Sequence, residues 1–229
     1  MKRLVILCAL GAMIAAPALA QSRLPTAKER NVTMQRLAVE AWTACIADEF
    51  VEEVHEVLTL DFRTLKYSRK IEKLASERVS DRCFNAMPRD YRRIELSGLP
   101  FAGGLAEQAI ERTSDEPLLM RLSMAAIGKP AETYSYTDAV ANCAVRGAPH
   151  LVANLFGTDV ASVEETDALE QLEPVFMICT QSGPAIDASP LATRSMLATA
   201  SYRLLAAQDE SGEEQATDAS RSEESEDDA

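Results

Sequence analysis

Apolar residues recur every three or four positions through most of the chain, which is the spacing of a single buried helical face. Outside the segments with this spacing, no run of four or more residues alternates strictly between apolar and polar, as a half-buried strand would. The sequence therefore predicts an all-α protein. The pattern places four helices in each half of the chain, over residues 33–46, 48–58, 67–84 and 100–112, and over 137–146, 149–156, 162–179 and 189–207.

The two halves repeat the same order of helices in nearly the same frame. Three pairs of positions keep a similar offset: Cys45 and Cys143 (98 positions), Cys83 and Cys179 (96), and Leu105 and Leu197 (92). The small losses between these pairs fall in predicted loops, where deletions are tolerated best. We therefore predict an internal repeat of two tandem four-helix units, residues 33–112 and 137–207.

Residues 113–136 are expected to connect the two units. Leu118, Leu119 and Leu122 predict a short helix, which Gly128 and Pro130 would end. The predicted connector is therefore short and helical.

Two adjacent glycines stand inside the fourth predicted helix of the first unit. Gly103 and Gly104 each disfavour a helix by about 1 kcal/mol relative to alanine. Because a glycine lets two backbones approach closely, we expect this pair to mark a tight helix–helix contact.

The N-terminus has the pattern of a secretory signal peptide, residues 1–20. Lys2 and Arg3 precede a short apolar run, and small residues lead to Ala20. The run is shorter than the ~20 residues that span a membrane, so we expect no transmembrane segment after cleavage. The mature protein is therefore predicted to be exported, as a periplasmic or secreted protein.

Removing the signal peptide leaves Cys45, Cys83, Cys143 and Cys179. An even number of cysteines in an oxidising compartment favours disulfides, although the count alone allows three pairings. The repeat favours pairing within each unit, Cys45 with Cys83 and Cys143 with Cys179. Closing each loop would stabilise the fold by about 4 kcal/mol.

Several short motifs of the second unit resemble a group of uncharacterised exported bacterial proteins built from one or two Cys…Cys helical units. The motifs are Cys-Ala-Val-Arg at 143–146, Ser162-x-x-Glu165, Leu172-x-Pro174-x-Phe176-x-x-Cys179, and Leu197-Ala198 leading to Tyr202-Arg203. The resemblance implies export and a repeated helical unit. The group has no assigned activity, so it implies no functional residues.

The formal net charge of −13 comes mostly from the C-terminus. Residues 209–229 hold ten Asp or Glu residues and a single basic residue, Arg221. This composition predicts a disordered acidic C-terminal tail over residues 208–229. A net negative charge also disfavours nucleic acid as a partner.

The sequence offers no recognisable catalytic, cofactor-binding or metal-binding constellation. It lacks a nucleophile elbow, a phosphate-binding loop, a His-Glu-x-x-His motif and a Cys-x-x-Cys pair. His55 and His150 are interpreted as helix-surface side chains. Ser162 and Glu165 have the spacing of a capping box, so the acidic residues there are expected to stabilise a helix start.

Two neighbouring helical faces carry opposite charges. The basic face is a candidate surface for an anion or a partner and consists of Lys66, Arg69, Lys70 and Lys73. The acidic face consists of Glu49, Glu52, Glu53 and Glu56. Three interpretations follow: the two faces pair with each other, the acidic tail covers the basic face, or the basic face binds an external anion.

The sequence therefore predicts an exported helical module that binds or supports an unknown protein or component of the bacterial cell envelope. One alternative is a periplasmic chaperone or inhibitor whose units open to expose apolar faces. Another is an enzyme with a cleft between the units, which would need buried ionisable residues without partners there.

Overall fold

The computed structural model describes residues 31–226 except 77 and 182, with side chains as far as Asp209. These residues form helices and no strands, which confirms the all-α prediction. The predicted signal peptide, residues 1–20, lies outside the described residues. The helices are α1 (Val32–Glu49), α2 (Val51–Thr59), α3 (Leu65–Ala75), α4 (Asp81–Ala86), the 3-10 turn η1 (Tyr91–Arg93), α5 (Gly98–Thr113), α6 (Leu118–Ile127), α7 (Tyr136–Gly147), α8 (Pro149–Phe156), α9 (Val163–Cys179) and α10 (Pro190–Glu226).

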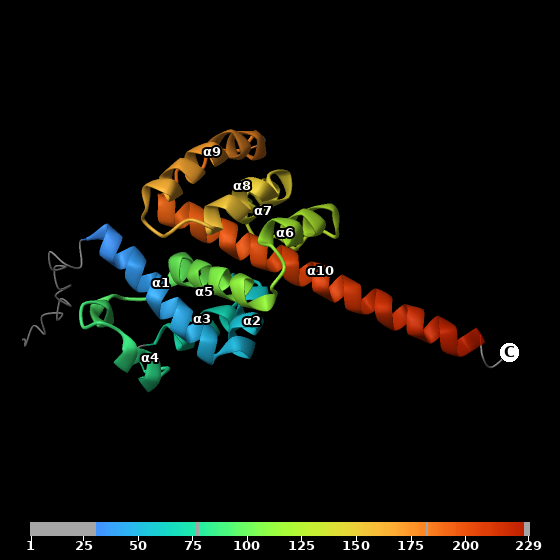
Figure 1. Ribbon diagram of the computed structural model, residues 1–229, viewed down its shortest axis with the longest axis horizontal. Helices are drawn as coiled ribbons and strands as arrows, with labels where there is room; N and C mark the ends of the chain where they lie inside the picture. The colour runs from blue at the N-terminus through green and yellow to red at the C-terminus, as the bar shows by residue number, and fades with distance from the viewer. Residues whose placement is uncertain (1–30, 77, 182, 227–229) are drawn as a thin grey trace, which may run out of the picture.

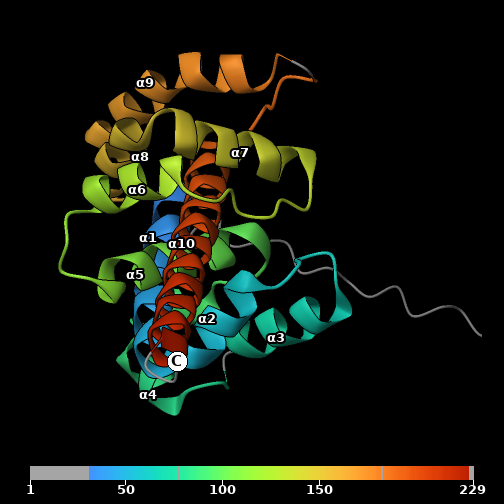
Figure 2. The same cartoon turned by 90° about the vertical axis from the view of Figure 1, so that its right-hand side faces the viewer.

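Helix α10 lies between the two halves of the chain. Figures 1 and 2 show α1–α5 on one side of α10 and α6–α9 on the other. Its most extensive packing is along α5, which belongs to the first half, and α7 is its next neighbour. The last helix of the second half therefore also completes the packing of the first half.

The buried apolar side chains form one cluster that runs through both halves. It includes Trp42, Phe101 and Leu105 from the first half, and Leu155 and Leu172 from the second. Helix α6 packs against α7 and α8. The expected connector is thus partly a core element, and the division into two separate four-helix units stays a prediction.

The structure corrects the helix predicted over residues 67–84. Helix α3 ends at Ala75, Ser76 has an extended backbone, and α4 begins after Ser80. The Ser80 hydroxyl accepts a hydrogen bond from the Cys83 backbone N–H and donates one to Glu49. A serine that caps a new helix in this way competes with continuation of the previous one.

The last helix also extends further than the sequence pattern indicated. It was expected to end near residue 207, but α10 runs to Glu226 and projects beyond the other helices in Figure 1. The structure therefore continues α10 through residues 208–226, and the disorder of the acidic tail stays a prediction. This segment contains no proline and six Glu residues, and glutamate is a good helix former.

Both predicted disulfides are present. Cys45 in α1 is bonded to Cys83 in α4, and Cys143 in α7 is bonded to Cys179 at the end of α9. The Cα atoms are 5.7 and 5.8 Å apart, respectively, which is the usual separation for a disulfide. The pairing favoured by the repeat is thus confirmed.

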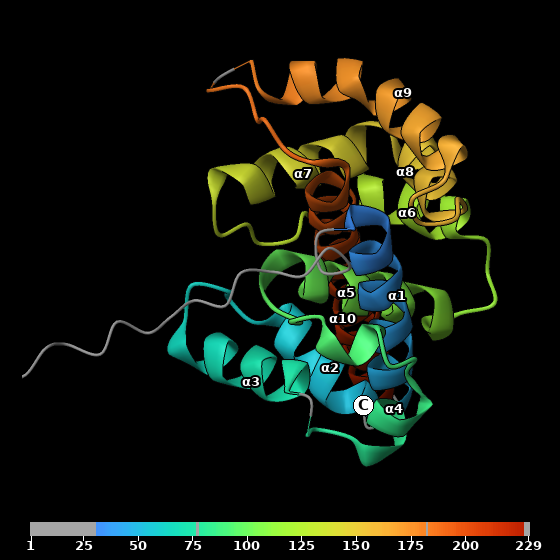
Figure 3. The same cartoon turned by 90° about the vertical axis from the view of Figure 1, so that its left-hand side faces the viewer.

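The two glycines of α5 lie where three helices approach one another. A Cβ atom at Gly103 would overlap Ser195 of α10, and one at Gly104 would lie 2.7 Å from the Thr43 Oγ1 of α1. Figure 3 shows α5 beside both α1 and α10. The predicted tight helix–helix contact is therefore confirmed, with α5 held between two neighbours.

Replacing Gly103 by alanine is expected to lower the free energy of unfolding by about 1–3 kcal/mol, because the added methyl group must push α10 away. Urea denaturation measures this change. Gly147→Ala is the matched control, since its Cβ would meet nothing within 4 Å, and its stability should stay level or rise. A Gly103→Ala protein as stable as the Gly147→Ala protein would contradict the tight contact.

Candidate functional site

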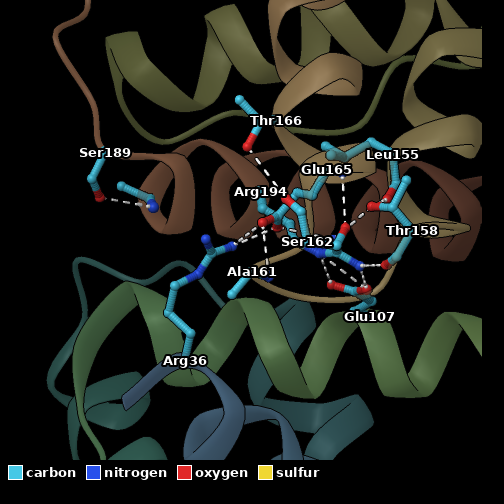
Figure 4. Close-up of polar contacts among 11 residues, drawn as sticks. Arg36, Glu107, Leu155, Thr158, Ala161, Ser162, Glu165, Thr166, Ser189 and Arg194 are labelled. Carbon is cyan, nitrogen blue, oxygen red and sulfur yellow. Dashed lines mark hydrogen bonds and ion pairs between the residues drawn. The ribbon is translucent and has the colours of Figure 1, made fainter. Parts of the chain in front are cut away.

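A buried cluster of charged side chains joins the two halves of the molecule. It consists of Arg36 from α1, Glu107 from α5, Glu165 from α9 and Arg194 from α10, and Figure 4 shows all four converging. Glu165 and Arg194 have only 1% and 4% of their surface exposed. Buried charges are expensive unless they are paired, so the pairing within this cluster decides its role.

Glu165 lies between two guanidinium groups. The Arg36 Nη2 is 2.5 Å from each carboxylate oxygen of Glu165, and the Arg194 Nη1 is 3.0 Å from Oε1. Arg194 also pairs with Glu107 and donates hydrogen bonds to Thr158. Two positive and two negative groups are thus balanced within one buried network.

The start of α9 places Glu165 in this position. Its backbone N–H donates to the Ser162 hydroxyl at 3.0 Å, which is one half of the predicted capping box. The Glu165 carboxylate instead accepts from the backbone N–H of Ala161, a residue with a φ of 63°. The helix cap therefore directs this carboxylate toward Arg36 and Arg194, a role that the sequence reading missed.

The charges in the cluster hold Glu165 ionised. Burial acts to raise its pKa, but the hydrogen bonds and charges of Arg36 and Arg194 outweigh burial and leave the pKa below its usual value. Burial acts to lower the pKa of Arg194, and Glu107 and Glu165 outweigh it in the same way. Glu165 and Arg194 therefore form a true ion pair at neutral pH.

Two further carboxylates lie beside the cluster, and the charge of Arg194 compensates them only in part. Burial and the charge of Glu107 raise the pKa values of Glu40 in α1 and Glu111 in α5. A raised folded-state pKa means that the ionised group opposes folding at neutral pH and that its protonated form favours folding.

Glu40→Gln is therefore expected to stabilise the protein at pH 7 by about 0.5 kcal/mol, because it removes a like charge that solvent only partly screens. The gain should disappear as the pH falls and Glu40 becomes protonated in the parent protein. Thermal unfolding at several pH values measures this effect, with the exposed Glu52→Gln as control. A stability that falls at pH 7 would contradict the prediction.

Two of the four residues of the predicted basic face form ion pairs within the protein. Lys66 and Lys70 of α3 both form ion pairs with Glu56 of α2, at 3.0 and 2.5 Å. Arg69 and Lys73 are exposed, and the described part of the chain shows no ion pair for either. Pairing between the two faces thus accounts for half of the basic set, and the anion-binding and tail-covering interpretations stay predictions.

The exposed face of α6 is apolar. Met120, Met124 and Ile127 follow one another at helical spacing and have 57%, 56% and 80% of their surface exposed. Leu119 beside them is 47% exposed. This stripe is the surface to which the chaperone interpretation would apply.

A cavity of about 410 Å³ opens between α2, α5, α6 and α10. Its apolar wall includes Val54, Ile110 and Leu205, and its polar groups include Arg112 and Arg121. These arginines donate to backbone oxygens of Ala44 and Ile110, each at 2.8 Å. We refer to this space as the main cavity, although the polar hollow between α8 and α9 is larger, at about 600 Å³.

A hydrogen bond between side chains from opposite halves closes one wall of the main cavity. The His55 Nδ1 and the Tyr202 hydroxyl are 2.7 Å apart. Burial, together with the charge of Asp209, raises the pKa of Tyr202 to about 12. Tyr202 therefore stays protonated and can act as a hydrogen-bond donor across the physiological range.

The buried ionisable residues between the halves all have partners. Arg36, Glu107, Glu165 and Arg194 each form an ion pair within the cluster, although the Arg36 Nε is buried without a hydrogen-bond partner. Among the described residues, no three His, Cys, Asp or Glu side chains are grouped to hold a metal ion. The enzyme interpretation needed unpartnered buried groups at this place, so the charge cluster does not support it.

Within the described residues, none of the helices combines the length and apolarity that crossing a membrane requires. In comparisons with protein families, curated proteins and solved structures, no match to this chain was found.

Proposed function

We propose that this chain is an exported binding protein of the cell envelope whose ligand lies in the main cavity. The observation that carries the proposal is the cavity itself. Its volume of about 410 Å³ falls within the ~300–1,000 Å³ typical of small-molecule sites. Such sites combine a mostly apolar wall with a few convergent polar groups, which is how this cavity is lined.

The lining favours an apolar ligand with an anionic end. Val54, Ile110 and Leu205 offer an apolar wall. Arg112 and Arg121 bring two positive charges to the same cavity and Asp209 brings one negative charge, so positive charge is in excess. Each arginine uses only part of its donor capacity on a backbone oxygen, since a guanidinium has five N–H groups. A fatty-acid-like amphiphile fits this combination of surfaces.

Export is supported by the two disulfides, which form and persist in oxidising compartments. The signal-peptide pattern of residues 1–20 agrees with it. A ligand of the envelope, such as a free fatty acid or a lipid fragment, would be available in that compartment.

We also propose that the two helical units arose by duplication of one unit. The helices that would be equivalent begin at similar offsets: α1 and α7 at Val32 and Tyr136 (104 positions), α2 and α8 at Val51 and Pro149 (98), α3 and α9 at Leu65 and Val163 (98), and α5 and α10 at Gly98 and Pro190 (92). Gly103 approaches Ser195, and these residues are also 92 positions apart. A residue that meets its own counterpart is expected near a two-fold axis relating two copies.

Titration of laurate into the mature protein, followed by calorimetry at pH 7, tests the proposed ligand site. Ala206→Leu fills the main cavity from α10 and should weaken laurate binding at least tenfold. Ala207→Leu is the matched control, because Ala207 is the adjacent residue of the same helix and does not line the cavity.

A second arm tests the charge of the ligand. Arg121→Gln should weaken laurate binding while leaving decanol binding nearly unchanged, since decanol has no charge to pair. No laurate binding at millimolar concentration, or equal binding by the Ala206→Leu and Ala207→Leu proteins, would rule out the main cavity as the site.

A further inference from the structure

A second cavity, of about 260 Å³, lies beside the contact between α5 and α10. Ala102 of α5 and Met196 and Thr199 of α10 line it, whereas Gly103, Glu107 and Arg194 line the space next to the charge cluster. The second cavity and the charge cluster therefore flank the same helix pair on two different sides.

The two sides are filled very differently. Next to the charge cluster, only about 30 Å³ remains, which is space for little more than a water molecule. At the offset of 92 positions, Ala102 corresponds to Arg194, and Thr199 corresponds to Glu107. The second cavity thus has small side chains where the charge cluster has an arginine and a glutamate. This correspondence between positions rests on the proposed duplication. The existence of the second cavity is independent of it.

Aromatic and apolar side chains form the walls of the second cavity. Phe62, Tyr67, Leu99 and Met196 line it. The Phe62 ring meets the rings of Tyr67 and Tyr134 edge to face, with centroids 6.4 and 5.7 Å apart. Rings held in this arrangement offer further edge and face contacts to a third ring, and the Met196 thioether is a favourable neighbour for an aromatic group.

The charges at the second cavity are already neutralised. Arg203 forms an ion pair with the buried Asp138, and its guanidinium lies over the Phe62 and Tyr134 rings, 5.8 Å from each centroid. Asp138 also accepts a hydrogen bond from the Tyr134 backbone N–H at 2.9 Å. A charged ligand group would lose its hydration here without gaining a free counter-ion.

We propose that the second cavity binds an uncharged aromatic ring of about the size of an indole. An apolar cavity of about 150 Å³ holds benzene, so 260 Å³ accommodates a bicyclic ring. Thr137 lines the cavity, and its exposed hydroxyl is 3.0 Å from the Ser135 hydroxyl. The Thr137 hydroxyl can accept a hydrogen bond from a ring N–H.

Indole is the probe that tests this proposal, with binding to the mature protein measured by calorimetry. Ala102→Leu adds a larger side chain to the part of the wall that α5 provides. Leu99→Trp places the indole ring of the new tryptophan at the partly exposed wall of the cavity. Each is expected to weaken indole binding at least tenfold. Leu99 is 38% exposed, so this variant should fold even if the buried Ala102→Leu does not.

Ala206→Leu is the control, because it fills the main cavity and should leave indole binding unchanged. Failure of the laurate site and failure of the indole site are therefore distinguishable. Tryptamine and indole-3-acetate, which are charged, should bind at least tenfold more weakly than indole. No indole binding at millimolar concentration, unchanged binding by folded Leu99→Trp, or tighter binding of a charged analogue would overturn the proposal.

Discussion

Replacing Glu165 by alanine is expected to lower the free energy of unfolding by about 3–5 kcal/mol, because removing one partner leaves a buried charge uncompensated. Arg36 would lose both of its 2.5 Å contacts, and Arg194 would keep only Glu107 as an anionic partner. Urea denaturation followed by circular dichroism measures the change.

The neighbouring Glu164→Ala is the matched control. Glu164 lies in the same first turn of α9 but is exposed, so its loss should change stability by less than about 0.5 kcal/mol. Replacing Glu165 and Arg36 together by leucine and methionine should recover much of the loss, since apolar residues can substitute for a buried ion pair. A Glu165→Ala protein within about 1 kcal/mol of the parent would contradict the structural role of the cluster.

The same variant predicts a pH dependence. Arg36 and Arg194 leave the pKa of Glu165 below its usual value even though burial opposes this, so its contribution is fully present above the unfolded-state pKa of about 4.3. The contribution is lost as the pH falls through the lower folded-state pKa. The stability difference between parent and Glu165→Ala should therefore shrink in acid and stay constant from about pH 5 to 8.

Removing the second disulfide by Cys143→Ser and Cys179→Ser is expected to cost about 4 kcal/mol. The two bridges close loops of similar size, with sequence separations of 38 and 36, so loss of either should cost a similar amount. Thermal and urea unfolding of each double variant measures the two costs separately. A change below about 1 kcal/mol for both would contradict the expected contribution of the loops.

The shape of the unfolding transition shows whether the two halves of the chain unfold together or separately. The buried side chains of both halves belong to one cluster, and α10 packs against both α5 and α7. We therefore expect one cooperative transition that shifts as a whole when either disulfide is removed. If only one half unfolded early, the halves would be independent folding units despite the helix that they share.

The two cavities and the charge cluster surround α5 and α10 in different ways. Glu107 and Arg194 close the space on one side of this helix pair, whereas Ala102 and Thr199 leave the other side open. One side is thus filled by paired charges, and the other keeps a cavity.

The sequence by itself determined the helical class, the pairing of the cysteines and the close approach at Gly103 and Gly104. These properties depend on local periodicity, on the similar offsets between the halves and on the absence of a side chain, all of which can be read along the chain. It did not reveal the break of the predicted third helix between Ala75 and Asp81, because serine capping outweighed the apolar spacing there.

Only the tertiary structure decided which charged residues are buried together and where the cavities lie. Arg36 and Glu165 are 129 positions apart, and nothing in their local sequence distinguishes them from exposed charged residues. Likewise, Ala102 is one of many helical alanines until α10 packs beside it. Local spacing sets the backbone of each helix, but the partner of a side chain is fixed by how the helices pack, and this packing depends on the whole chain at once.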